Sequence, residues 1–141
     1  MNTTPMPNAG GRPPADPVDA KRGIEALYAT GHWLLTQDRP ADAACVFRAM
    51  ALLAPQDERS WLALGACHEA LGQSERALQM YGTGRVLARP SVRCDIARSR
   101  LLRTKDRDHE ADAVLEHASE TAEGLDDQVL IELVAAERKV R

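Results

Sequence analysis

The chain of 141 residues is long enough to bury one continuous core but too short for two well-packed domains. Its net charge of −3, with acids and bases interspersed, offers no large positive field, so we expect no nucleic-acid partner. No window approaches the ~18 uninterrupted apolar residues of a membrane span, and the start lacks the apolar run of a secretory signal, so the sequence predicts a cytoplasmic protein without a membrane span.

The first fifteen residues are rich in proline and contain a Gly-Gly pair but few large apolar side chains. Such a segment cannot bury enough surface to offset its ordering entropy, so we expect a disordered tail over 1–15. Order is predicted to begin at Asp16, whose carboxylate can cap a helix that starts with Pro17. The folded domain is therefore predicted to span 16–141.

The first predicted helix spans 17–37, where apolar side chains recur at helical spacing. The polar stretch 37–40 ends this helix, and Pro40 begins a second one over 40–53. Proline suits a first helical turn but disfavours helical geometry in the residue before it. Pro55 then ends the first pair of helices.

The second pair of helices follows the same pattern. Asp57 and Ser60 are alternative caps for its first helix, which Gly72 closes. Ser74 is predicted to cap the next helix, 75–88. The inward-facing side chains of that helix are predicted to be Ala77, Leu78, Tyr81 and Leu87.

A third pair of helices is less regular. Ser91 can cap its first helix, and the polar stretch 106–108 supplies a turn before the second. After Gly124 a last helix is predicted over 126–140, and the simplest role for it is to cap the array with a polar outer face. Its inward-facing side chains are predicted to be Val129, Leu130, Leu133 and Val134.

The chain repeats itself with a period of 34 residues. Gly31, Ala43 and Phe47 recur at this offset as Gly65, Ala77 and Tyr81, and then more loosely as Ser99, Ala111 and Leu115. Two paired helices need a small residue where their backbones approach and a bulky one to fill the space beside it. We therefore predict an all-α array of about three helix-turn-helix units, over 24–57, 58–91 and 92–125, followed by the capping helix.

These positions resemble the tetratricopeptide repeat, which carries a large residue at position 4, Leu-Gly at 7 and 8, Ala at 20 and an aromatic residue at 24. A narrower resemblance covers 39–78, where the spacing is similar to that of the class II chaperones of bacterial type III secretion. The residues that carry the second resemblance are Ala43, Phe47, Leu53, Asp57, Trp61, Leu64, Gly65, Ala66, Cys67, Gly72 and Gln73. The fold implied is a tetratricopeptide-repeat superhelix.

The resemblance implies a cytoplasmic, non-enzymatic chaperone that keeps hydrophobic translocator subunits soluble before export. In that family a short extended segment of the secreted client lies in a concave groove, and members often form homodimers through the N-terminal helix region, so a homodimer is left open. The groove is lined by the first helix of each pair, at positions 2, 5, 9 and 12. The candidate groove residues on this basis are Tyr28, His32, Leu35, Leu62, Ala66, Glu69, Ile96 and Arg100.

Two alternatives stay open at this stage. The candidate groove side chains could simply pack between repeats, and the chain could be a generic repeat adaptor that binds a folded protein partner. Catalytic and metal sites are not expected, because the histidines have no zinc-binding spacing and no nucleophile has a base nearby in sequence. We expect no cofactor, and we expect the three cysteines to be reduced and buried.

Overall fold

The computed structural model describes Gly10 and residues 16–140, so the tail predicted over 1–15 lies, apart from Gly10, outside the described residues. Seven helices and no strand occupy the described range. The helices are α1 (Pro17–Thr36), α2 (Pro40–Leu53), α3 (Glu58–Ala70), α4 (Ser74–Leu87), α5 (Val92–Thr104), α6 (Asp108–Leu125) and α7 (Gln128–Lys139). Among these described helices, none combines the length and the apolar composition that a membrane crossing requires.

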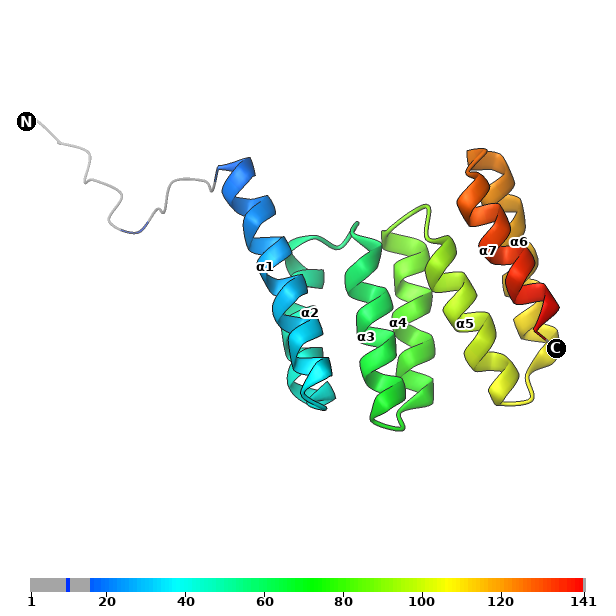
Figure 1. Cartoon of the computed structure of the whole chain (residues 1–141), viewed down its shortest axis with the longest axis horizontal. Helices are drawn as coiled ribbons and strands as arrows, with labels where there is room; N and C mark the ends of the chain where they lie inside the picture. The colour runs from blue at the N-terminus through cyan, green and yellow to red at the C-terminus, as the bar shows by residue number, and fades with distance from the viewer. Residues whose placement is uncertain (1–9, 11–15, 141) are drawn as a thin grey trace, which may run out of the picture.

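The helices stack side by side along the long axis of the molecule, from α1 at one end to α6 and α7 at the other (Figure 1). Each helix packs against the next one in the chain, and the first helices of successive pairs also touch, α1 with α3 and α3 with α5. Within residues 16–140 the second helices α2, α4 and α6 make no such contact with one another. The stack therefore bends with α1, α3 and α5 on its inner side, which confirms the predicted repeat superhelix.

The helix starts agree with the sequence analysis only in part. The carboxylates of Asp16 and Asp57 accept backbone N–H bonds at the starts of α1 and α3, which decides between the two alternative caps of α3. Ser74 does not cap α4 but is its first residue, and the Ser91 hydroxyl makes no capping bond. At α5 the Glu58 carboxylate of α3 accepts the N–H of Cys94 instead, at 3.0 Å.

The turn inside each pair is closed in the same way. Asp38, Gly72 and Asp106 are 34 residues apart, and each has a φ between 55° and 71°, in the left-handed region. The next N–H in each case bonds to the carbonyl five residues earlier, for example Gln73 to His68 at 2.8 Å. This motif satisfies carbonyls at the helix end, and it shows that the third unit keeps the repeat period in its turn.

The predicted small-residue positions lie where paired helices touch. A Cβ atom on Gly31 would come closer than 3.0 Å to the Phe47 ring, and one on Gly65 would do the same with the Tyr81 ring. Both rings are almost fully buried. Each position therefore needs glycine because the aromatic ring on the partner helix leaves no room for a Cβ atom, and not because of the glycine's backbone conformation.

The third unit replaces the glycine and the ring together. Ser99 stands at the glycine position and Leu115 at the ring position, and both are buried. The smaller leucine leaves room for the serine Cβ, and the Ser99 hydroxyl donates to the Ala111 carbonyl of α6 at 3.0 Å. The loose repeat signal in this unit thus reflects a paired change of size, which keeps the two helices in contact.

The core forms three successive clusters of buried side chains, which lie among α1 to α3, α4 to α6 and α5 to α7. Trp61 packs against both the first and the second cluster, which makes the core continuous. Two cysteines are buried as predicted, but Cys45 is exposed.

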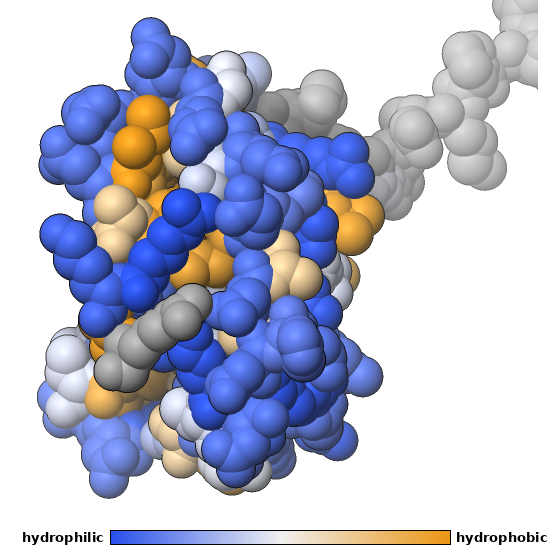
Figure 2. All heavy atoms as spheres, turned by 90° about the vertical axis from the view of Figure 1, so that its right-hand side faces the viewer, coloured by the Kyte–Doolittle hydropathy of each residue, from blue (hydrophilic) through white to orange (hydrophobic). Residues whose placement is uncertain are grey.

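Two predictions about inward faces are wrong. On α4, Leu87 is exposed. On α7, Val129 and Leu133 are exposed, because the helix rests on both α5 and α6 through another face. The inward side chains of α7 are Leu130, Ile131, Val134 and Glu137. Seen from this end, the surface is largely hydrophilic with scattered hydrophobic patches (Figure 2).

Gly65→Ala should lower the free energy of unfolding by about 1–3 kcal/mol, because the new methyl group overpacks the Tyr81 ring. Gly23→Ala is the matched control, since a Cβ there meets no atom within 4 Å and alanine favours the helix. Urea denaturation followed by circular dichroism measures both. Adding Tyr81→Leu to Gly65→Ala imitates the third unit and should recover part of the loss; a further loss of similar size would contradict this explanation.

Candidate binding surface

The first helices of the three pairs carry all the residues that the sequence analysis places in a groove. We call their side chains at repeat positions 2, 5, 9 and 12 the A-helix surface, since α1, α3 and α5 form the inner row of the stack. Its members discussed below are Glu25, Tyr28, His32, Leu35, Arg59, Leu62, Ala66, Glu69, Ile96 and Arg100.

The part of the A-helix surface on α1 is aromatic. Tyr28 and Leu35 are half-buried against the first core cluster, and His32 is exposed. The His32 ring meets the Tyr28 ring edge-on at 4.5 Å between centroids and the Phe47 ring at 5.6 Å. The buried ring of Phe47 thus supports both side chains from below and fixes their orientation.

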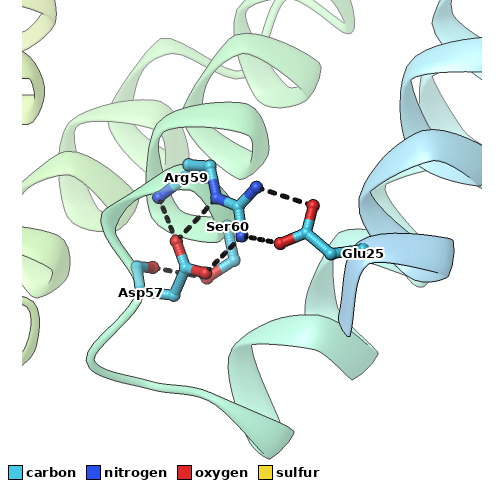
Figure 3. Close-up of polar contacts among 4 residues, drawn as sticks. All are labelled: Glu25, Asp57, Arg59 and Ser60. Atoms are coloured by element: carbon cyan, nitrogen blue, oxygen red, sulfur yellow. Dashed lines mark hydrogen bonds and ion pairs between the residues drawn. The ribbon is translucent and has the colours of Figure 1, made fainter. Parts of the chain in front are cut away.

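Arg59 joins the first two units. Its guanidinium donates two hydrogen bonds to the Glu25 carboxylate, at 2.7 and 3.1 Å, and further bonds to the Asp57 carboxylate (Figure 3). It also lies 4.5 Å from the centre of the Tyr28 ring. Glu25 and Arg59 occupy the same position of successive repeats, so this ion pair joins two residues one repeat apart and links α1 to α3.

The hydrogen bonds of Arg59 stabilise the ionised form of the two carboxyl groups beside it. The Arg59 side chain, with its backbone N–H, holds the pKa of the Asp57 carboxyl below its usual range, and it lowers the pKa of Glu25 as well. Both carboxylates therefore stay ionised under acidic conditions that would begin to protonate free side chains.

The part of the A-helix surface on α3 combines one apolar side chain with small and charged ones. Leu62 is half-buried against the second core cluster, whereas Ala66 and Glu69 are exposed. Glu69 accepts a hydrogen bond from the Tyr81 hydroxyl of α4. Burial and the adjacent Glu69 raise the pKa of Tyr81, so its hydroxyl remains a donor and ties the two helices of the pair together.

On α5 the A-helix surface is covered at Ile96 and pinned at Arg100 by α7. Ile96 is only 8% exposed and belongs to the third core cluster with Val134 of α7. The Arg100 side chain is exposed but donates to the buried carboxylate of Glu137 at 2.8 Å, and Arg103 donates to the Glu137 carbonyl. The other six of the eight candidates lie together on α1 and α3.

Sequence reasoning missed the two charged links. Glu25 and Arg59 stand at position 2 of the first two repeats. Their opposite charges, one repeat apart, could have indicated the ion pair. Glu137 gave a weaker signal, a single acid at helical spacing from the apolar side chains of α7. Among the described residues no cluster of three or more His, Cys, Asp or Glu is placed to hold a metal ion.

The chain is similar to the translocator chaperones of bacterial type III secretion. It is 34% identical over 64 residues to the low calcium response locus protein H of Yersinia pestis; this stretch is 45% of the chain and 38% of that protein. The match thus spans little more than a third of the curated relative's length. No known protein-family model matches the chain.

Solved structures extend the similarity over most of the fold. The type III secretion translocator chaperone SycD of Yersinia enterocolitica superposes with a TM-score of 0.72 at 28% identity, over 82% of this chain and 87% of that chain. PcrH of Pseudomonas aeruginosa, in complex with the chaperone binding region of PopB, gives a TM-score of 0.70 at 26% identity, over 83% of this chain and 95% of that chain. The resemblance drawn from the sequence is thereby confirmed.

Asp57→Asn should remove a pH-dependent part of the stability. Because the pKa of Asp57 is lowered by folding, its carboxylate stabilises the fold above the unfolded-state pKa of about 3.9, and this contribution disappears as the pH falls through the lowered value. Asparagine remains a good helix cap, so the comparison isolates the charge. Urea denaturation should therefore show the wild type more stable near neutral pH and the two proteins equal under strongly acidic conditions.

The matched control repeats the substitution in an Arg59→Met background, where most of the pH-dependent difference should vanish. If Asp57→Asn instead changed the free energy of unfolding by the same amount at every pH, Arg59 would not be the group that lowers the pKa of Asp57.

Proposed function

We propose that this chain is a cytoplasmic, non-enzymatic chaperone of bacterial type III secretion, which binds an extended segment of a hydrophobic translocator subunit and keeps it soluble before export. The proposal is carried by the shared fold with SycD and PcrH over more than four fifths of the chain. PcrH has been solved with the chaperone binding region of a translocator, PopB.

The A-helix surface on α1 and α3 has the properties that such a segment requires. Tyr28, Leu35 and Leu62 are half-buried, so they present apolar atoms while remaining fixed in the core. A preformed surface loses little conformational entropy when a flexible chain docks, because its own side chains are already ordered. We infer that these three side chains contact apolar anchor residues of the client.

The polar members of the same surface lie beside its apolar side chains and already have partners within the chain. His32 and Arg59 lie beside the Tyr28 ring, and Glu69 lies beyond Ala66 on α3. Arg59 is already paired with two carboxylates, so it is less able to bind a client carboxylate than an unpaired arginine would be. We therefore expect recognition to depend on apolar side chains more than on charge.

The third unit takes part in a different way. Ile96 can contact a client only if α7 moves away from α5, because it is buried in the same core cluster as Val134. Arg100 is exposed, but its guanidinium is held by the Glu137 carboxylate. We infer that the segment binds across the first two units, and that Ile96 and Arg100 anchor α7 when no client is bound.

Ala66→Glu should abolish solubilisation of the client without unfolding the chaperone. Ala66 is exposed in the middle of the A-helix surface, so a longer charged side chain blocks docking while the core is left intact. The measurement is co-expression with a hydrophobic translocator subunit of a type III secretion system, followed by separation of soluble and insoluble fractions. Affinity of the purified complex should fall by about tenfold or more.

Ala113→Glu on α6 is the matched control, since Ala113 is an equally exposed helical alanine outside the A-helix surface. Leu62→Asp gives a second test through one of the apolar anchors, with circular dichroism to check folding. Undiminished solubilisation by Ala66→Glu would show that the client does not bind here, and capture of a folded partner alone would favour the adaptor interpretation.

A further inference from the structure

A polar cavity lies away from the A-helix surface, between α4, α5 and α6. Its volume is about 640 Å³. It is lined by Ser91, which precedes α5, and by Asp95 and Arg98 at helical spacing along α5, whereas the candidate groove residues 96 and 100 point to other sides of the same helix. We call it the arginine cavity, after its lining residues Arg85, Arg89 and Arg98.

The arginine cavity concentrates positive charge in a protein whose net charge is negative. Three arginines line it against the single carboxylate of Asp95, which gives a net charge of +2 when His117 is neutral. Within residues 16–140, neither Arg89 nor Arg98 takes part in a salt bridge, and Arg85 only approaches Asp95, at 3.9 Å. Two of the three guanidinium groups are therefore available to an anionic partner.

Buried polar atoms of the same cavity lack partners. Among the described residues, the hydroxyl of Ser91, one carboxylate oxygen of Asp95 and the Nε of Arg98 make no hydrogen bond. Ser91 is 5% exposed and Asp95 is 2% exposed. The other oxygen of Asp95 lies 3.1 Å from the Nδ1 of His117.

Keeping Asp95 here is costly for the fold. Burial raises the pKa of its carboxyl, even though His117, Arg85 and Arg98 act in the opposite direction. An unsatisfied buried polar group lowers stability, so a cluster of them in one cavity is more consistent with recognition than with packing. Asp95 also holds Arg85 and His117 near one another and is thus a positioning residue for the cationic wall.

An apolar cavity adjoins the arginine cavity along α4. It has a volume of about 540 Å³, and the two share Gly82 and Val86 in their lining. Val86 is 61% exposed and Leu87 is 49% exposed at its edge, although both are large apolar side chains. The two cavities together form a surface that is cationic at one end and apolar at the other.

We propose that this surface binds an acidic, amphipathic peptide segment of a partner protein. Carboxylates of the segment pair with Arg89 and Arg98, and an adjacent apolar side chain packs on Val86 and Leu87. A peptide supplies both carboxylates and apolar side chains, whereas a small inorganic anion supplies only the charge. The binding is independent of the proposed docking on α1 and α3.

The test uses the full chain and a fluorescein-labelled peptide of about twelve residues in which Asp and Glu alternate with Leu and Ser. Fluorescence anisotropy should show saturable binding that weakens as salt is added. Arg89→Gln and the double variant Arg85→Gln/Arg98→Gln should each weaken it, the double variant by about tenfold or more. Arg89 is exposed and unpaired in the described structure, so its replacement leaves folding intact.

Arg48→Gln on α2 is the matched control, because Arg48 is an exposed arginine remote from the cavity in sequence and does not line it. The same peptide with lysine in place of every acid should not bind. Wild-type affinity in the Arg89→Gln and Arg85→Gln/Arg98→Gln variants, displacement of the peptide by inorganic phosphate at low concentration, or loss of binding in Ala66→Glu would each overturn the proposal. The last result would place the peptide on the A-helix surface and leave the proposed chaperone function intact.

Discussion

The close contact between a small residue on one helix and a large one on its partner determines most of this structure. Gly31 under Phe47 and Gly65 under Tyr81 allow the two helices of a pair to approach, and the ring fills the space between them. The same rings then support the A-helix surface: Phe47 lies beneath Tyr28 and His32, and the Tyr81 hydroxyl bonds to Glu69. The same ring contacts therefore determine both the packing of the core and the positions of side chains on the A-helix surface.

Polar contacts join the units in series. Arg59 pairs with Glu25 between the first and second units, Glu58 accepts the N–H of Cys94 between the second and third, and Glu137 binds Arg100 between the third unit and α7. Each link uses a charge of one helix to satisfy a group on a later or earlier one. No unit buries its apolar face alone, so these links and the continuous core make the array cooperative.

Most of the fold could be predicted from the sequence because its signals are local or periodic. Pro17, Pro40 and the 34-residue echo of Gly, Ala and aromatic residues predict helices over 17–37, 40–53 and 75–88, which agree with α1, α2 and α4 to within one residue at each end. Helix caps were less predictable. At the start of α5 the Ser91 hydroxyl makes no capping bond, and the carboxylate of Glu58, a residue 33 positions earlier in the chain, accepts a backbone N–H instead. The faces of α7 could not be read from its own pattern, because a terminal helix adapts to two neighbours at once.

The candidate site could be located on α1 and α3 for the same reason, since its positions follow from the repeat. The burial of Ile96 by α7 and the pairing of Arg100 with Glu137 depend on contacts between distant segments and left no periodic signal. The arginine cavity was missed because its residues come from three helices and share no motif.

The most direct test of the central claim is photo-crosslinking from a benzophenone amino acid at position 66 in the complex with the translocator. Docking on the A-helix surface predicts a crosslink from position 66 and none from position 113 on α6, and the reverse pattern would contradict it.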